Sequence, residues 1–321
     1  MLGAGYWGQK LIRAMREVVG VGRMFCVDPR PELRQELERR FGAVHVVDRE
    51  DDLIDDPRVK AVVIATPASS HYALAKRWIM AGKHVLVEKP IALDVGAARE
   101  LTTLAEHMGV GLLPGHTYHF NGAEEYLRSF VRSGELGDPL WLQSERANLG
   151  RFRQDVSVLW DLGPHDATIL VDLLDPEIET CQSTGSPTNQ GSLETCCVTM
   201  RTDRQVGVAW TLSWRSPEKV RRIALVGTRH TVLWDDLEGA WPLRIYRTEF
   251  HQESPSTGHA EVVARVTGVS LPAVDHGEPL LKECQHFVDV VNGFTQPVLG
   301  ARHILKVTAV LARAEAALRP A

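Results

Sequence analysis

The sequence predicts an α/β protein in which a doubly wound parallel sheet is followed by an α+β domain with a large, mostly antiparallel open sheet. In the first third of the 321 residues, short apolar runs alternate with amphipathic stretches, which is the βαβα pattern of a parallel sheet with helical crossovers. After Gly115 the chain changes to segments that alternate apolar and polar residues, as antiparallel strands with one covered face do. The length is sufficient for two ordinary domains.

The elements follow from hydrophobic periodicity. Strands are expected at residues 24–27, 60–65 and 83–87 and up to residue 114, with helices from the first glycine turn to about residue 18 and at 32–41, 72–81 and 94–108. Further along, helices are expected at 123–133, 167–174 and 303–318, and strands at 139–146, 196–201, 206–214 and 222–226. Residues 252–268 are the best candidate for a mobile loop.

This pattern predicts three consecutive parts. Residues 1–115 form the nucleotide-binding domain, residues 116–300 form an α+β domain for substrate binding and oligomerisation, and residues 301–321 contain a helix that packs back on the first domain. The open face of an antiparallel sheet often serves as a subunit interface, so a homodimer or homotetramer is expected.

Composition excludes several functional classes. The 36 Lys and Arg residues are scattered and balanced by 41 Asp and Glu, so no basic surface for nucleic acid is expected. No apolar run approaches the roughly 20 residues of a membrane helix, which predicts a cytoplasmic protein. The five cysteines form no CxxC pair, and the thirteen histidines show no HxxxH or HExxH spacing, so no metal site and no disulfide are expected.

The chain opens with a GxGxxG motif made of Gly3, Gly5 and Gly8, with Tyr6 and Trp7 inside it. In a Rossmann domain these glycines provide a tight turn, let the backbone approach a pyrophosphate and allow close helix packing. Asp28 lies 20 residues past Gly8, where an acidic side chain accepts hydrogen bonds from the adenosine ribose. Because a carboxylate repels a 2′-phosphate, NAD is favoured over NADP.

Two qualifications belong to this motif. The nearby Arg30 would suit a 2′-phosphate, and Asp28 could also be a solvated turn residue before Pro29. Only Met1 and Leu2 precede the glycine turn, so the first strand is apparently truncated, although that strand is central in a doubly wound sheet. A start codon placed too late would explain this, and so would a real truncation; we favour the misplaced start.

The strand at 83–87 ends in Glu88-Lys89-Pro90, where the carboxyl end of a parallel strand meets the ligand crevice. Lys89 there can donate a hydrogen bond to a substrate oxygen and stabilise a developing alkoxide, and Glu88 can fix its position electrostatically. The alternative is a surface ion pair at a strand end.

In the second part, Asp161 and His165 precede the apolar stretch 167–174. Pro164 suits a first helical turn, so His165 is expected near a helix N-terminus, where the dipole keeps the imidazole neutral and suited to act as a general base. Asp161, four residues earlier, can orient the imidazole. The alternative is an aspartate that caps the helix and a histidine that only packs.

These motifs, taken together and in this order, resemble the Gfo/Idh/MocA oxidoreductase family. The resemblance rests on GAGYWG, Ile64-Ala65-Thr66-Pro67 with His71, Glu88-Lys89-Pro90, and Asp161-Leu162-Gly163-Pro164-His165, and it covers essentially the whole chain. It implies that Lys89, Asp161 and His165 are the catalytic residues. It also implies that the nicotinamide side is lined by Thr66, Pro67, His71, Glu88 and Lys89.

Within that family the chain looks most like members that oxidise nucleotide-diphosphate sugars at C3, such as UDP-N-acetylglucosamine or its uronate. Arg151 and Arg153 would then be partners for a diphosphate or a carboxylate, or else an exposed basic turn. The expected substrate contacts are His116, Asn148, Arg151, Arg153 and Trp160. His119 stands where relatives often have arginine. The alternatives are a dehydrogenase of a free polyol such as an inositol, and a non-catalytic NAD-binding regulator.

Overall fold

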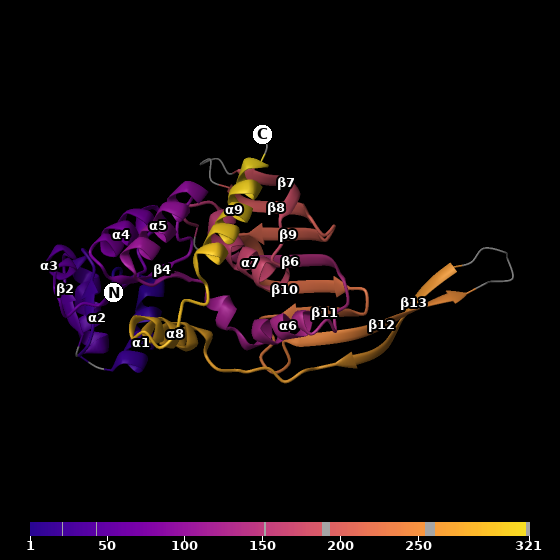
Figure 1. Ribbon diagram of the computed structural model, residues 1–321, viewed down its shortest axis with the longest axis horizontal. Coiled ribbons are helices and arrows are strands. Elements are labelled where there is room, and N and C mark those ends of the chain that lie inside the picture. Colours follow the sequence, from indigo (N-terminus) through magenta and orange to yellow (C-terminus); the bar gives the residue numbers. More distant parts are fainter. Residues whose placement is uncertain (21, 43, 151, 188–192, 254–260, 319–321) are drawn as a thin grey trace. The chain divides into compact units, whose positions relative to one another are not determined.

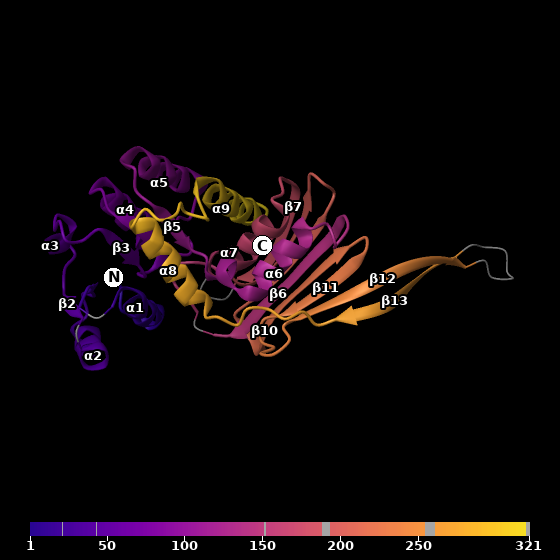
Figure 2. The ribbon, with the colours of Figure 1, turned by 60° about the horizontal axis from the view of Figure 1, so that its bottom comes forward.

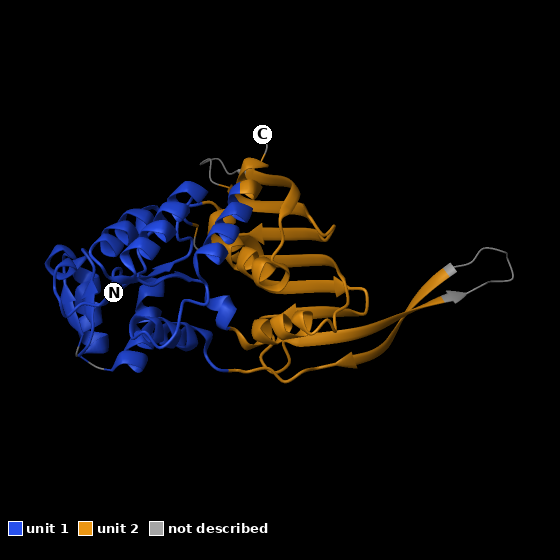
Figure 3. Ribbon diagram, viewed as in Figure 1, with its two compact units in different colours: residues 1–120, 153–156, 277–312 blue, residues 121–152, 157–276, 313–321 orange. Residues whose placement is uncertain are grey.

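The computed structural model describes all residues except 21, 43, 151, 188–192, 254–260 and 319–321. The described residues form two compact units (Figure 3). Unit 1 comprises residues 1–120, 153–156 and 277–312, and unit 2 comprises residues 121–152, 157–276 and 313–321. The chain therefore re-enters unit 1 twice, whereas the sequence suggested consecutive parts. In the described portion, no helix has the length and apolar character needed to span a membrane.

Unit 1 contains a parallel sheet whose central position is held by a single residue. The amide of Leu2 donates to Val63 O at 2.8 Å and its carbonyl accepts from Ala65 N at 2.8 Å, and Leu2 also bridges to Val27. This links the strand pairs into the order β2-β1-Leu2-β3-β4-β5, the doubly wound arrangement expected from the sequence. The strands are β1 (Phe25–Val27), β2 (His45–Val47), β3 (Ala61–Ile64), β4 (His84–Glu88) and β5 (Leu112–Gly115).

Helices cover both faces of this sheet and produce two hydrophobic clusters. Trp78 of α4 and Ile304 of α9 belong to one cluster, and Leu11 of α1 and Phe287 of α8 belong to the other. The helix that begins at residue 301 thus contributes to the core of unit 1 up to residue 312. The elements are α1 (Tyr6–Val19), α2 (Pro31–Phe41), α3 (Asp51–Ile54), α4 (Ala68–Met80), α5 (Val95–Met108), the 3₁₀ helix η1 (Thr117–Phe120), α8 (Pro279–Val291) and α9 (Ala301–Ala316).

Unit 2 is an eight-stranded sheet in the order β13-β12-β11-β10-β6-β9-β8-β7 (Figure 1). Among the described strands of this sheet, β6 and β9 pair in parallel and the other neighbours pair antiparallel. The helices α6 (Gly122–Arg132) and α7 (Val158–Leu174) lie on one face of the sheet (Figure 2), so the α+β expectation is confirmed. The strands are β6 (Pro139–Leu149), β7 (Ile178–Pro187), β8 (Leu193–Thr202), β9 (Gly207–Ser213), β10 (Arg215–Gly227), β11 (His230–Asp235), β12 (Leu243–Glu253) and β13 (Glu261–Ser270).

The prediction of a mobile loop at residues 252–268 is wrong for its described part. Strands β12 and β13 pair in antiparallel register from Ile245↔Ser270 to Glu253↔Glu261 and form a hairpin that extends past the other strands of unit 2 (Figure 1). Residues 254–260 lie outside the described residues. The alternation of Val262, Ala264 and Val266 is the strand signal, and charged neighbours obscured it.

Candidate functional site

The glycine turn of unit 1 is shaped so that two of its glycines admit no side chain. A Cβ atom on Gly3 would lie 2.6 Å from Ala65 O, and Gly3 has a φ of +92°. A Cβ on Gly8 would lie 2.1 Å from Gly3 O, whereas a Cβ on Gly5 would meet nothing within 4 Å. Helix α1 begins at Tyr6 without a side-chain cap, so its first amides are directed at the turn. This arrangement fits a dinucleotide pyrophosphate.

Tyr6 and Trp7, which follow this turn, have different environments. Tyr6 is 62% exposed, and the Lys10 ammonium lies over its ring. Trp7 donates its indole N–H to Glu88 Oε1 at the end of β4. Trp7 therefore ties the glycine turn to the strand end that carries Lys89.

Asp28 lies at the end of β1, but its carboxylate is already engaged by the protein. Oδ2 accepts from Ala4 N and from the Arg30 guanidinium, each at 2.8 Å, and Oδ1 accepts from Arg30 N at 3.0 Å and Arg30 Nε at 2.8 Å. Asp28 is only 1% exposed, whereas the Arg30 side chain is 54% exposed. Burial alone would raise the pKa of Asp28, but the hydrogen bonds from Arg30 and Ala4 outweigh it and hold the pKa below its ordinary value. The sequence did not reveal that Arg30 covers this carboxylate.

Glu88 and Lys89 lie at the carboxyl end of β4, as the sequence predicted. Burial raises the pKa of Glu88 to about 7, against the opposing effects of Lys89, the Trp7 indole and Arg153. The Lys89 amide donates to Glu88 Oε2 at 3.2 Å. Glu88 is therefore a buried carboxyl that titrates near neutrality beside the lysine.

A second carboxyl in unit 1, missed by the sequence analysis, is affected by the charge of Glu88. Glu283 of α8 is fully buried, accepts a hydrogen bond from Thr117 Oγ1 at 3.1 Å, and has a pKa well above its ordinary value because of burial and repulsion by Glu88. Two neighbouring carboxyls cannot both ionise cheaply, so Glu283 stays neutral when Glu88 is charged. No sequence motif marks Glu283, since it lies 195 positions after Glu88.

Thr66 and Pro67 lie in the loop after β3, and His71 lies in the first turn of α4. His71 is 1% exposed, and its ring nitrogens lie 2.8 Å from Pro90 O and 2.9 Å from Thr66 O. Burial lowers the pKa of His71. This histidine therefore braces the Thr66 loop against the segment after Lys89, which is a supporting position rather than a free ring edge beside the nicotinamide.

The segment 153–156 contributes two charged groups to unit 1. Asp155 Oδ2 accepts from Ala68 N at 2.8 Å and so caps α4, a role that the sequence analysis missed. Burial raises the pKa of Glu88 and lowers that of His71; the charge of Arg153 opposes the first effect and adds to the second, so it lies within electrostatic reach of the predicted nicotinamide side.

The remaining residues expected to contact substrate differ in how far they are buried. Two are buried: His116, 3% exposed, lies with Nδ1 3.2 Å from His303 Nε2, and Trp160, 3% exposed, packs in the core of unit 2. Both side chains therefore have little exposed surface, and their contact with a substrate stays a prediction. Asn148 is half-buried near the end of β6. Arg151 lies outside the described residues.

Asp161 and His165 lie inside a helix, not before one. Ser157 caps α7, which runs from Val158 through Pro164 to Leu174. The expectation that Pro164 begins the helix is therefore wrong, and His165 is too far from the N-terminus for the dipole argument, because that effect falls off within the first turn. Asp161, in the first turn, and His165 are four residues apart and therefore share one face of α7.

Two further contacts fix α7 in unit 2. Asp161 Oδ2 accepts from Trp214 Nε1 at 3.1 Å. Asp166, next to His165, pairs with Arg146 of β6 at 2.9 Å and 3.2 Å, and both side chains are buried. The pair joins the helix to the sheet.

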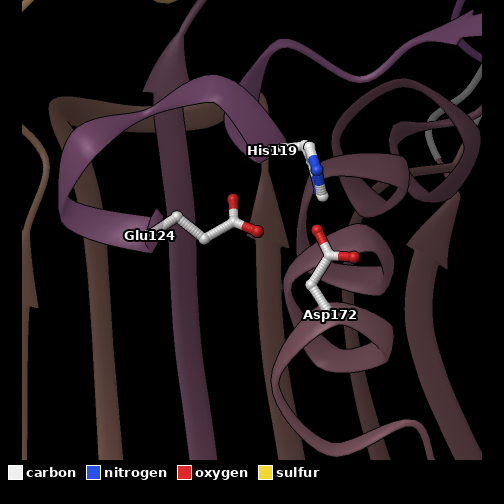
Figure 4. A group of neighbouring side chains, drawn as sticks. All are labelled: His119, Glu124 and Asp172. Carbon is white, nitrogen blue, oxygen red and sulfur yellow. The ribbon is translucent and has the colours of Figure 1, made fainter. Parts of the chain in front are cut away.

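A second buried ionic group lies between α6 and α7. The carboxyl groups of Glu124 and Asp172 point toward each other (Figure 4), and Arg128 lies 3.4 Å from both. Burial, the hydrogen bond to Asp172 and its charge raise the pKa of Glu124 well above its ordinary value. A protonated Glu124 is therefore the form that allows these two carboxyls to adjoin.

Two family models match the chain. One, an oxidoreductase family with an NAD-binding Rossmann fold, covers residues 1–116, and the other, the GFO/IDH/MocA C-terminal domain, covers residues 125–233. Among solved structures, UDP-N-acetylglucosamine 3-dehydrogenase GnnA from Acidithiobacillus ferrooxidans superimposes with a TM-score of 0.81 at 22% identity, over 99% of this chain and 96% of that one. GenD2 from gentamicin A biosynthesis, solved in complex with NAD, gives a TM-score of 0.82 at 21% identity, over 98% and 92% of the chains. At these identities the likeness establishes a shared fold.

The relatives found by sequence are also oxidoreductases or dehydrogenases by name. UDP-N-acetylglucosamine 3-dehydrogenase of Acidithiobacillus ferrooxidans is 28% identical over 272 residues, which is 81% of this chain and 80% of that protein. An uncharacterized oxidoreductase of Synechocystis, sll0816, is 36% identical over 122 residues, but the match spans 36% of this chain and 33% of that protein. The scyllo-inositol 2-dehydrogenase (NADP(+)) IolW of Bacillus subtilis is 27% identical over 126 residues, or 39% and 34% of the two chains.

Proposed function

Because this chain belongs to the Gfo/Idh/MocA family and is an NAD(P)-dependent dehydrogenase, we propose that it transfers hydride between C3 of a nucleotide-diphosphate sugar and nicotinamide. The observation that carries the proposal is the match to a UDP-N-acetylglucosamine 3-dehydrogenase over 81% of this chain and 80% of that protein. The presence of Lys89, Asp161 and His165 together argues against a regulator without turnover.

In the proposed mechanism one residue accepts the proton of the sugar hydroxyl and another stabilises the negative charge that develops on its oxygen. His165 takes the proton of the sugar hydroxyl, and Asp161 holds the imidazole in the tautomer that can accept it. Lys89 stabilises the alkoxide that develops as the proton leaves. When bound, NAD supplies the acceptor for the hydride that leaves the same carbon, which becomes a ketone. Reduction of a ketosugar follows the reverse path.

The cofactor proposal is NAD, with Arg30 as the residue that controls access to the ribose site. Asp28 can accept ribose hydroxyls once Arg30 turns outward, and the half-exposed guanidinium is free to do so without opening the core. The same outward position would offer a cation to a 2′-phosphate. Arg30 is thus expected to determine how strongly NADP competes.

For the substrate, we retain Asn148, Arg151 and Arg153 as candidate contacts. A diphosphate or a uronate carboxylate calls for cations, and the two arginines are the candidates in this stretch. His116 and Trp160 are each 3% exposed, so they would contact the substrate only through a small part of the side chain.

We also propose that a second copy of the chain covers the open face of the eight-stranded sheet. The strand pairings place Trp141, Leu233 and Tyr246 on this face. They place Phe250 and Val266 of the β12–β13 hairpin on the same face. Trp141 is 39%, Leu233 37%, Phe250 60% and Val266 60% exposed, so this face presents apolar surface that a partner would remove from water.

The first experiment is NADH absorbance at 340 nm with purified protein, NAD and a panel of UDP-sugars, dTDP-sugars and free polyols. Signal with a nucleotide sugar only is the expected result, and Lys89→Met and His165→Ala should each lower turnover at least about 100-fold while NAD still binds. Signal with a free polyol only would replace the proposed substrate class. Unchanged turnover in both variants would remove these residues from the mechanism.

A further inference from the structure

Trp214 contacts a residue of the proposed mechanism although it belongs to no motif. Its indole Nε1 donates to Asp161 Oδ2 at 3.1 Å, across the layer between the sheet and α7. We propose that Trp214 is a positioning residue that fixes the orientation of the Asp161 carboxylate, and through it the imidazole of His165. The inference rests on the proposed function, in which Asp161 orients His165.

The indole is held rigidly. Trp214 is 1% exposed and continues the row of β9 side chains that faces α7, after Val208, Trp210 and Leu212. Its amide donates to Glu194 O at 2.9 Å, and the Phe152 ring packs edge-on against the indole with centroids 6.0 Å apart at 88°. Because its backbone and its ring are both held in place, the Trp214 indole N–H is already oriented toward Asp161 and loses no conformational freedom during the reaction.

The acceptor is fixed as well. Asp161 lies in the first turn of α7, and the buried Arg146–Asp166 pair one turn later joins the same helix to β6. The salt bridge therefore sets the position of the helix, and the indole sets the rotamer of one side chain on it. Together they restrict the orientation of the Asp161 carboxylate, as is required of a carboxylate that orients the imidazole of His165.

The chemistry predicts the direction of the effect. An indole N–H only donates, so it favours the ionised carboxylate over the acid. Without this donor, Asp161 would need a higher pH to ionise and its rotamer would be less restricted. Both changes lower the fraction of the protein in which an ionised Asp161 orients His165, and the side chains that contact the substrate themselves stay unsubstituted.

The chain offers a matched control in Trp210. It lies on β9, is 1% exposed, faces the same helix layer, and its indole Nε1 has no hydrogen-bond partner among the described residues. Trp210→Phe therefore removes a similar volume but no bond to Asp161. Trp214→Phe removes both, so the difference between the variants isolates the hydrogen bond.

The test combines kinetics with NMR of the indole N–H groups. In Trp214→Phe we expect kcat to fall about tenfold with a KM change below about threefold, and the acid limb of the kcat profile to move up by roughly half to one pH unit. Trp210→Phe should leave the acid limb in place. In an Asp161→Asn background, Trp214→Phe should cost little more.

The NMR readout does not depend on turnover. The indole resonance that Trp214→Phe removes should shift with pH in the unmodified protein and lose that titration in Asp161→Asn. If both phenylalanine variants change the acid limb equally, Trp214 only packs and the proposal is overturned; a Trp214 resonance that does not respond to Asp161→Asn also overturns it. A titrating resonance in a protein that turns over no sugar would leave the positioning contact intact and reject the proposed function instead.

Discussion

At the scale of single residues, the clearest consequence concerns Glu88. Burial raises the pKa of Glu88, and Lys89, the Trp7 indole and Arg153 oppose that effect. Because burial has the largest effect, the folded protein prefers the neutral form of Glu88. The carboxyl therefore couples the stability of unit 1 to pH.

We predict that Glu88→Gln flattens the dependence of unfolding on pH between 5 and 8. The folded pKa of about 7 exceeds the ordinary value of 4.5, so the stabilisation is complete below about pH 4.5 and is lost as pH rises through 7. The loss amounts to roughly 3 kcal/mol of unfolding free energy. Urea titrations at pH 5, 6, 7 and 8 measure it as the difference between the two proteins. A parallel pH dependence in both would contradict the assignment.

We predict that Arg30→Ala weakens NADP binding about tenfold or more, because a guanidinium–phosphate contact is charge-assisted. NAD binding should stay unchanged or improve, since Asp28 no longer has to release Arg30 before it accepts the ribose. Calorimetry with each cofactor measures both effects. Better NADP binding by the variant, or preferred NADP binding by the unmodified protein, would contradict our view of this pair.

How far the sequence predicts the site can be judged from particular residues. The position of Lys89 directly after a strand was predicted correctly, because residues 83–87 form a short apolar run that the periodicity identifies as a strand. The start of α7 was misplaced because Pro164 usually signals a first turn, whereas here the helix is buried on many sides and its packing compensates for the lost hydrogen bond. Trp214, Arg146, Asp155 and Glu283 act through contacts between distant positions, which local patterns do not encode.

At the scale of elements, the glycine turn offers a comparison of two positions in one motif. Gly8→Ala places a Cβ 2.1 Å from Gly3 O, so we predict a loss of at least about 2 kcal/mol in unfolding free energy. Gly5→Ala meets no protein atom within 4 Å, so stability should change by less than about 0.5 kcal/mol while NAD affinity falls about tenfold, because the new methyl faces the pyrophosphate.

Thermal unfolding and NAD calorimetry on both variants check this prediction. Equal stability losses at Gly5 and Gly8 would mean that the motif is only a turn. An unchanged NAD affinity in Gly5→Ala would place the pyrophosphate elsewhere.

Elements differed in how readily they could be predicted. The helices of unit 1 that were predicted have a clear period and were located to within a few residues. Helices α3 and α8 were not predicted, and the hairpin β12–β13 was taken for a loop. Its exposed charged side chains, such as Arg247 and Glu249, are equally common in loops, so composition does not identify it as a strand. What makes it a strand is the pairing of β12 with β13.

At the scale of the whole molecule, the proposed subunit interface gives a prediction. Leu233→Arg would bury a charge in that interface, so we expect the mass measured by sedimentation to fall to that of a smaller assembly. The control is Met108→Arg in unit 1, since Met108 is 38% exposed and Leu233 37%. An unchanged mass for Leu233→Arg, or a monomeric unmodified protein, would reject the interface.

Because unit 1 is built from separate stretches of the chain, its core is completed late during synthesis. The cluster around Leu11 and Leu37 is completed by Leu280, Cys284 and Phe287 of α8. A ribosome that has synthesised residues 1–120 has therefore produced the parallel strands but not the helix that closes one side of their core. Throughout the synthesis of unit 2 the apolar side chains that await α8 remain available to water or to a chaperone, so the nascent chain carries its nucleotide-binding sheet unfinished until residue 291 has emerged.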